Sequence, residues 1–183
     1  DGDKVLADNS DGQGLVRDIT LNAGFDIKGR DVLLIGGGGA AAGVLGPLAA
    51  CGPRRIVVAN RTRNKAEYIV KIHEAFTAQH QVDVMACDLT EIADSFDLVI
   101  NSTSASLSGG GVPVSASVLR SGALAVDLMY GPAAQGFMQW AKDNGASAID
   151  GLGMLVEQAA EAFYVWRGVM PPAAVVMAEL RQG

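Results

Sequence analysis

Four consecutive glycines at positions 36–39 stand between an apolar run and a stretch of small residues. Gly36, Gly38 and Ala41 fit the spacing G-x-G-x-x-G/A, which is typical of loops that bind the phosphates of a dinucleotide. Glycine permits a tight turn and lets a phosphate approach the backbone without a Cβ in the way. A helix that opens after the glycines would add amide groups that attract anions. The stretch therefore predicts a buried strand, a phosphate-binding loop and the start of a helix.

Two other interpretations of the glycine stretch stay open on the motif alone. One is a flexible Gly/Ala connection that binds nothing. The other is a membrane span, because residues 32–53 carry no charge and Gly39 and Gly43 have the spacing of a membrane helix-packing motif. Seven glycines and Pro47 make this stretch a poor span, and we expect no membrane contact.

The residues after a second apolar run indicate which dinucleotide the loop would bind. In an NAD site, an Asp or Glu at the end of the second strand binds the ribose 2′-hydroxyl. Here the run ends in Asn60, Arg61 and Thr62, without a carboxylate. A guanidinium can hydrogen-bond a 2′-phosphate through two donors and stack on adenine, and Arg63 and Lys65 are adjacent cations. We therefore predict NADP as the cofactor.

The fold that would position these groups can be predicted from the whole chain, in which apolar runs alternate with helical patterns. The alternation predicts the class α/β, a Rossmann-type doubly wound parallel sheet with three α/β/α layers and strand order 3-2-1-4-5-6. Ligands then bind at the carboxyl ends of the first and fourth strands. We expect strands at residues 31–35, 55–59, 82–86, 96–101, 123–128 and 147–149. We expect helices at residues 12–22, 40–50, 62–78, 133–144, 152–168 and 172–182, with one or two helical turns at 115–119 and a loop at 102–111.

The composition narrows the partners and the compartment. The chain has 183 residues, a net charge of −6 and two cysteines. This charge disfavours nucleic acid or an anionic membrane as a general partner. Cys51 and Cys87 lack metal or redox spacing, so we expect reduced thiols, a cytoplasmic protein and no metal site. In the helix at 62–78, the pattern predicts that Ala66, Ile69, Val70, Ile72 and Phe76 face inward.

Six motifs together resemble the shikimate dehydrogenase family, in the right order and at compatible spacing over almost the whole chain. They are Asn9-Ser10-Asp11-Gly12-x-Gly14, Gly36-Gly37-Gly38-Gly39-Ala40, Asn60-Arg61-Thr62, Asn101-Ser102-Thr103-Ser104, Asp127-Leu128-Met129-Tyr130 and Asp150-Gly151-Leu152-Gly153-Met154-Leu155-Val156-x-Gln158-Ala159. The resemblance implies NADPH-dependent, reversible reduction of 3-dehydroshikimate to shikimate in aromatic amino-acid biosynthesis.

The resemblance also implies roles for single residues. Asp11 would be the catalytic aspartate, whose partner lysine matches no lysine of this chain, although Asp11 alone would also suit a helix cap. Asp11, Tyr130 and Gln158 would bind the substrate. Where the family often has Ser-Arg after the glycines and alanine, this chain has Ala41 and Ala42, so a cation near the phosphates is lost. The cofactor contacts would be Gly36, Gly37, Gly38, Gly39, Ala40, Asn60, Arg61, Thr62, Lys65, Thr103, Leu128 and Gly151.

The resemblance covers only the cofactor-binding part of a two-domain family. We expect residues 1–23 to be an inter-domain strand and helix, and residues 24–183 to be the Rossmann domain. Its C-terminal helices would pack on a substrate domain absent from this sequence, so the chain would be a fragment that binds NADP with little turnover. Alternatives are a quinate/shikimate dehydrogenase of broader specificity and a non-catalytic nucleotide-binding module. The apolar stripe at residues 152–166 could instead pack in the core or form a homodimer.

Overall fold

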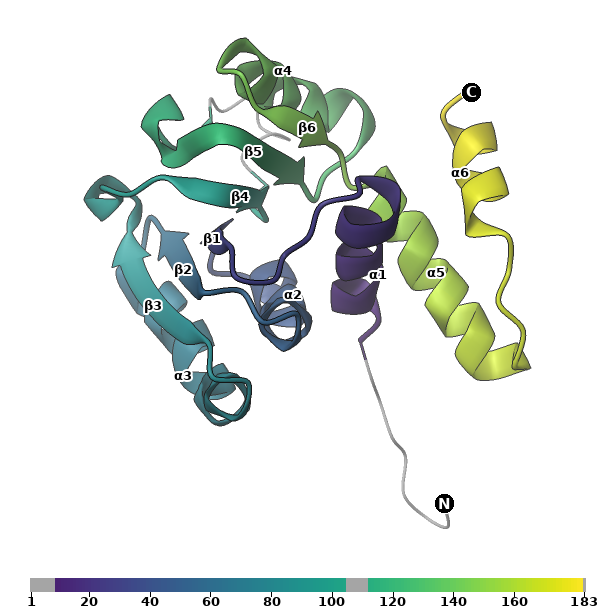
Figure 1. The fold of residues 1–183 in the computed structure, drawn as a ribbon, viewed down its shortest axis with the longest axis horizontal. Helices are drawn as coiled ribbons and strands as arrows, with labels where there is room; N and C mark the ends of the chain where they lie inside the picture. The colour runs from purple at the N-terminus through teal and green to yellow at the C-terminus, as the bar shows by residue number, and fades with distance from the viewer. Residues whose placement is uncertain (1–8, 105–111, 183) are drawn as a thin grey trace.

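The computed structural model describes residues 9–104 and 112–182, and Figure 1 shows their arrangement. Within these residues one sheet has the order β3-β2-β1-β4-β5-β6, with every neighbouring pair parallel. The predicted fold class and strand order are confirmed. Residues 1–8, which precede the first expected helix and would hold the inter-domain strand, and most of the loop expected at 102–111 lie outside the described residues. The strands are β1 (Asp31–Ile35), β2 (Arg55–Asn60), β3 (Asp83–Asp88), β4 (Phe96–Asn101), β5 (Leu119–Asp127) and β6 (Ser147–Ile149).

Helices connect the strands and cover both faces of the sheet (Figure 1). The α-helices are α1 (Asp11–Arg17), α2 (Gly39–Ala50), α3 (Arg63–Gln79), α4 (Gln135–Asp143), α5 (Leu152–Arg167) and α6 (Ala173–Leu180). The chain also has a π-helical segment η1 (Asp18–Asn22) and the short 3₁₀ helices η2 (Leu89–Glu91), η4 (Ala116–Val118) and η5 (Gly131–Ala134).

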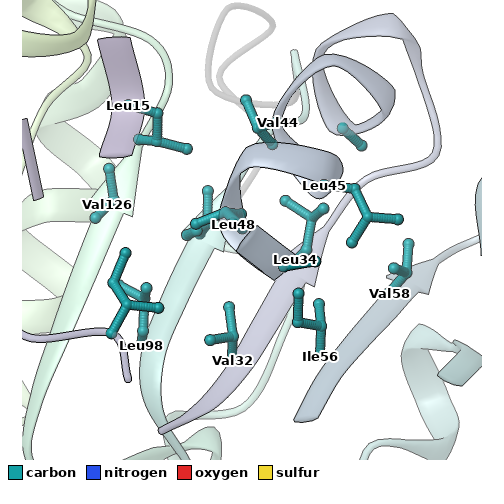
Figure 2. Packing of buried hydrophobic residues seen from close by; sticks show 14 of the residues in the cluster. Leu15, Val32, Leu34, Val44, Leu45, Leu48, Ile56, Val58, Leu98 and Val126 are labelled. Carbon is teal, nitrogen blue, oxygen red and sulfur yellow. The ribbon is translucent and has the colours of Figure 1, made fainter. Parts of the chain in front are cut away.

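Two hydrophobic cores lie on opposite faces of the sheet because strand side chains alternate between the faces. One core joins Val32, Leu34 and Leu98 to Leu15 of α1 and Leu48 of α2, as Figure 2 shows. The other joins residues such as Leu33, Val99 and Ala125 to Phe137 and Ala141 of α4. Burial on both faces explains why β1 reads as a continuous apolar run.

Several local predictions differ from the structure. The α-helix expected at residues 12–22 ends at Arg17 and continues as the π-helical η1. The turns expected at 115–119 are one short 3₁₀ helix, and β5 already begins at Leu119. In α3 the predicted burial of Ile72 and Phe76 is wrong, since they are 52% and 41% exposed. The buried side of α3 is formed by Ala66, Ile69 and Thr77, so the apolar stripe is narrower than the pattern suggested.

The amino ends of the central strands hold a buried charge network that the sequence did not indicate. Asp31 is fully buried and forms ion pairs with Arg54, Arg55 and Arg120. Arg120 also binds Asp97 at 2.6 Å. Arg54 and Arg55 therefore belong to the edge of the sheet opposite to the glycine loop, and they contribute no charge beside Arg61.

Candidate active site and cofactor cleft

The glycine loop begins where the carboxyl ends of β1, β2 and β4 meet. Ile35 pairs with Asn101 across β1 and β4. The Ile35 carbonyl accepts hydrogen bonds from the Ser102 backbone N–H at 2.8 Å and the Ser102 hydroxyl at 2.7 Å. The Gly36 N–H in turn donates to the Ala59 carbonyl of β2 at 2.8 Å. This is the crevice where the winding of a doubly wound sheet reverses, and where ligands of such sheets bind.

The four glycines of the loop divide into a packed pair and an open pair. Gly36 has φ +130°, a conformation that side chains rarely adopt, and it lies against Ser102. A Cβ on Gly37 would lie 2.8 Å from the Lys65 Cβ. By contrast, nothing lies within 4 Å of a Cβ built on Gly38 or Gly39, which lead into α2. The open pair leaves the backbone at the amino end of α2 accessible, as an approaching phosphate requires.

The residues after β2 present two exposed cations beside this opening. The Asn60 side-chain amide donates to the Thr62 carbonyl at 2.9 Å, which shapes the turn into α3. Arg61 and Lys65 are exposed, and neither forms an ion pair within the described part of the chain. Arg63 differs, because it binds Glu67 at 2.9 Å and Glu91 at 3.0 Å. Of the three adjacent cations, Arg61 and Lys65 are thus the two free to bind an anion.

A cavity of about 330 Å³ lies next to the start of α2. Seven of the predicted site residues line it, and they come from α1, α2, α5 and the ends of β4 and β5. The predicted lining residues are Asp11, Ala40, Thr103, Leu128, Tyr130, Gly151 and Gln158. Five further residues line the cavity and were not predicted to do so, although all of them belong to the motifs quoted above: Ser102, Ser104, Met129, Met154 and Leu155.

Asp11 reaches this cavity because α1 packs very closely against two other helices. A Cβ on Gly12 would lie 2.6 Å from the Gly43 carbonyl oxygen of α2. A Cβ on Gly14 would lie 2.6 Å from the Met154 carbonyl oxygen of α5 and 2.7 Å from the Gln158 Cβ. Glycines two residues apart thus serve two different interfaces, which accounts for the G-x-G spacing after Asp11.

Asp11 does not cap α1 through its side chain. It is the first residue of the helix, and its N–H donates to the Asn9 side-chain oxygen at 2.7 Å. The backbone N–H at the start of α1 is therefore bound by the Asn9 side chain and not by the Asp11 carboxylate. The half-buried Asp11 carboxylate remains on the cavity wall, where it can accept a hydrogen bond from a ligand hydroxyl.

A buried amide and carboxylate hold the strand ends that form the cavity floor. The Asn101 amide nitrogen donates to the Asp127 carboxylate at 3.1 Å, and the Asn101 side-chain oxygen accepts from the Thr103 hydroxyl at 2.8 Å. Asp127 also accepts from the Met129 N–H at 2.9 Å. These bonds fix Thr103 and the backbone beside Leu128. Asn101 thus stabilises the turn that follows β4.

Residues at the start of α5 form another part of the cavity wall. The Gly151 N–H donates to the Met129 carbonyl at 2.8 Å, so the two segments are joined through the backbone. The neighbouring Asp150 binds Arg181 at 2.9 Å. Tyr130 is half exposed and also lines the cavity.

The cavity combines a few polar groups with an apolar surface, as small-molecule sites commonly do. A carboxylate, an amide, a phenol and a hydroxyl could hold a polyhydroxylated ligand by hydrogen bonds. Leu128, Met154 and Leu155 offer apolar area for a planar ring. No Lys, Arg or His occurs among the described residues that line the cavity. Residues 9–104 and 112–182 also contain no cluster of three His, Cys, Asp or Glu suited to a metal ion, and no helix long and apolar enough to cross a membrane.

Comparisons with known sequences and solved structures give consistent matches. A curated relative from Methylibium petroleiphilum, named shikimate dehydrogenase (NADP(+)), is 58% identical over 181 residues, which are 99% of this chain and 62% of that protein. An Ael1 enzyme from Pseudomonas putida superimposes with a TM-score of 0.86 at 40% identity, over 98% of this chain and 65% of that one. Shikimate 5-dehydrogenase from Thermus thermophilus, solved with NADP(H) and shikimate, gives a TM-score of 0.76 at 27% identity, over 95% of this chain and 62% of that one.

Two family models match separate parts of the chain. Residues 19–109 match shikimate/quinate 5-dehydrogenase, and residues 151–181 match the shikimate 5′-dehydrogenase C-terminal domain. The chain spans 62% to 65% of the length of the curated relatives it matches. Motif order, fold, cavity position and these matches lead to one conclusion: the chain belongs to the shikimate dehydrogenase family.

Proposed function

We propose that this chain binds NADP and takes part in the reversible NADPH-dependent reduction of 3-dehydroshikimate to shikimate. The observation that carries the proposal is one cavity that joins Asp11, Gln158 and Tyr130 to Ala40 at the start of α2. A ligand in this cavity would lie beside the opening of the glycine loop. The relatives named shikimate dehydrogenase (NADP(+)) support the assignment.

The residues at the carboxyl edge of the sheet fit NADP. Gly38 and Gly39 leave space for the pyrophosphate at the amino end of α2, with Gly36 and Gly37 shaping the turn. Arg61 and Lys65 would bind the 2′-phosphate, with Asn60 and Thr62 forming the loop between them. When bound, the nicotinamide would supply or accept the hydride. Thr103, Leu128 and Gly151 would border it.

The polar side chains of the cavity would hold and orient the substrate. The Asp11 carboxylate would accept a hydrogen bond from a substrate hydroxyl, and the Gln158 amide and the Tyr130 hydroxyl would bind further oxygens. Charge on the carbonyl oxygen during reduction needs an acid or a cation nearby. Since no Lys, Arg or His occurs in the described lining, we place the catalytic lysine in the part of the relatives' length that this chain does not span.

A consequence is that the chain alone binds NADP but oxidises shikimate poorly or not at all. The outer part of α5 and α6 exposes apolar side chains, including Phe163 at 43% and Trp166 at 78%. We propose that the remaining part of the family's proteins covers them, rather than a second copy in a homodimer. The free thiols of Cys51 and Cys87 suit a cytoplasmic setting.

The test uses the full-length gene product that contains this chain. Initial rates of cofactor reduction are measured with shikimate and with quinate, each with NADP and with NAD. The proposal expects shikimate with NADP to give the highest kcat/KM, and Asp11→Asn to lower it without weakening NADP binding. Comparable rates with quinate would favour the broader quinate/shikimate activity. Absence of turnover with intact NADP binding would favour a non-catalytic nucleotide-binding module.

A further inference from the structure

One ion pair, between a partly exposed arginine and a buried carboxylate, joins the two helices that carry Asp11 and Gln158. Arg17, in the last turn of α1, donates from its Nε to the Glu157 Oε2 at 2.8 Å. Glu157 is only 3% exposed, although it is charged and lies outside the cavity. Glu157 directly precedes Gln158 in α5. Contacts that fix the direction of the Glu157 side chain therefore also fix the rotation of this turn of the helix.

The second Glu157 oxygen is also bound. The Asn22 side-chain amide of η1 donates to the Glu157 Oε1 at 3.3 Å and to the Asp18 Oδ1 at 2.9 Å. Within residues 9–104 and 112–182, the side-chain hydrogen bonds that join α1 and η1 to α5 all end on Glu157. π-Helical segments are frequent at functional sites, and this one places Asn22 where it can bridge both carboxylates.

Glycines stand at two tight points between α5 and the segment α1–η1, where Gly14 lies against Gln158 and Gly153 lies against the Asp18 carboxylate. Where the helices approach most closely, α1 presents Gly14, which has no side chain to interlock with α5. A buried ion pair seldom adds much net stability, because desolvation of the charges offsets their attraction. Buried polar contacts are better attested as devices that select one register between helices.

We propose that Arg17 and Glu157 are positioning residues, whose ion pair sets the rotation of α5 against α1 at which Asp11 and Gln158 face the same cavity. This inference rests on the proposed function, in which these two side chains hold the substrate. It assigns a role in substrate binding to two residues that do not touch the substrate.

The test compares Arg17→Met with Arg120→Met in the full-length gene product. Both arginines are partly exposed and bind a buried carboxylate, Glu157 for Arg17 and Asp31 for Arg120, but Arg120 lies at the opposite edge of the sheet. We expect Arg17→Met to lower kcat/KM for shikimate about tenfold, because small displacements of substrate-binding groups are costly. The Kd for NADPH, followed by tryptophan fluorescence, should stay within about twofold of wild type, a change of under ~0.5 kcal/mol. Arg120→Met should lower the Tm without changing either constant.

Two further variants keep the inference testable. Arg17→Lys retains a cation for Glu157 and should recover most of kcat/KM. If Arg17→Met does not fold, Glu157→Gln removes the charge while its side-chain oxygen can still accept from Asn22, and it should lower the same constant. An unchanged kcat/KM beside a lowered Tm would show a purely structural pair and overturn the inference. Wild-type protein without shikimate turnover would overturn the proposed function, and the inference with it.

Discussion

Gly14 of α1 lies against Gln158 of α5 so closely that a Cβ on residue 14 would be 2.7 Å from the Gln158 Cβ. The same Cβ would be 2.6 Å from the Met154 carbonyl oxygen, which belongs to the backbone and cannot rotate away. The distance between α1 and α5 thus depends on the absence of a side chain at residue 14. This interhelical distance also determines how far Asp11 lies from Gln158 across the cavity.

We expect Gly14→Ala to lower the free energy of unfolding by ~1–3 kcal/mol, as overpacking of a tight interface does. It should also raise the KM for shikimate in the full-length gene product. Gly136→Ala in α4 is the control, since nothing lies within 4 Å of a Cβ there and alanine favours a helix. Urea unfolding of both variants makes the comparison. Equal stability of the two would contradict the packing argument.

Substitutions in the glycine loop can separate an effect on folding from an effect on NADPH binding. Gly39→Ala places a methyl group in open space at the first position of α2, so folding should be unaffected or slightly favoured. The methyl group would occupy the approach of the pyrophosphate, and we expect the Kd for NADPH to rise at least ~10-fold, or ~1.4 kcal/mol. Fluorescence titration of the variant checks this.

Gly36→Ala should show the opposite pattern in unfolding experiments. Its φ of +130° strains any other residue, and its Cβ would collide with Ser102, so we expect a loss of ~1–3 kcal/mol in stability. If Gly39→Ala destabilised the protein as much as Gly36→Ala, the open pair would have a structural role instead.

Matched substitutions of Arg61 and Arg63 test whether the chain recognises the 2′-phosphate of NADP. Arg61 has no ion-pair partner among the described residues, whereas Arg63 is held by Glu67 and Glu91. We expect Arg61→Ala to weaken NADP binding by about 10- to 100-fold, since charged hydrogen bonds contribute ~1.5–3 kcal/mol, and to leave NAD binding unchanged. Arg63→Ala should have a much smaller effect on either Kd. Similar losses for NADP and NAD in Arg61→Ala would contradict recognition of a 2′-phosphate.

The sequence was sufficient for the fold and for most of the cavity, for identifiable physical reasons. Strands buried on both faces produce apolar runs such as residues 32–35, and parallel strands bring their carboxyl ends to one edge. Residues that follow those runs therefore meet, as Ala40, Thr103 and Leu128 do at the cavity. Asp11 and Gln158 became candidates only through the family resemblance, because neither helix pattern distinguishes a cavity residue from a surface one.

The charge relationships could not be read from the sequence because they depend on three-dimensional partners. Arg63 looked equivalent to Lys65, but its ion pair with Glu91 bridges 28 residues. The pair of Arg17 and Glu157 bridges 140 residues. Nothing in either local pattern indicates the partner. The exposure of Ile72 similarly depends on which turn of α3 meets the sheet, and periodicity defines that only approximately.

Asp31 and Asp18 are both buried, yet their environments shift the carboxyl pKa in opposite directions. Burial raises the pKa of Asp31, but hydrogen bonds from Arg54 and Arg120 and the charge of Arg55 outweigh burial and hold it below the usual 3.8. Its stabilising contribution is thus present above pH 3.8 and is lost as the pH falls through the lower native pKa. Asp31→Asn should lower stability at pH 7 and flatten the acid limb of the stability profile.

Asp18 should behave in the opposite way. Burial raises its pKa above 3.8, the nearby Glu157 and Asp150 raise it further, and the Asn22 hydrogen bond and the Arg181 charge only partly offset these effects. In the window between 3.8 and the raised value, the native state binds more protons than the unfolded state, so this group's contribution falls as the pH rises. Asp18→Asn keeps an oxygen that accepts from Asn22 and removes the charge, so we expect unchanged or higher stability at pH 7. Urea midpoints from about pH 2 to about pH 8 cover the acid limb of Asp31 and the window of Asp18, and a loss at pH 7 in Asp18→Asn equal to that in Asp31→Asn would refute the assigned direction.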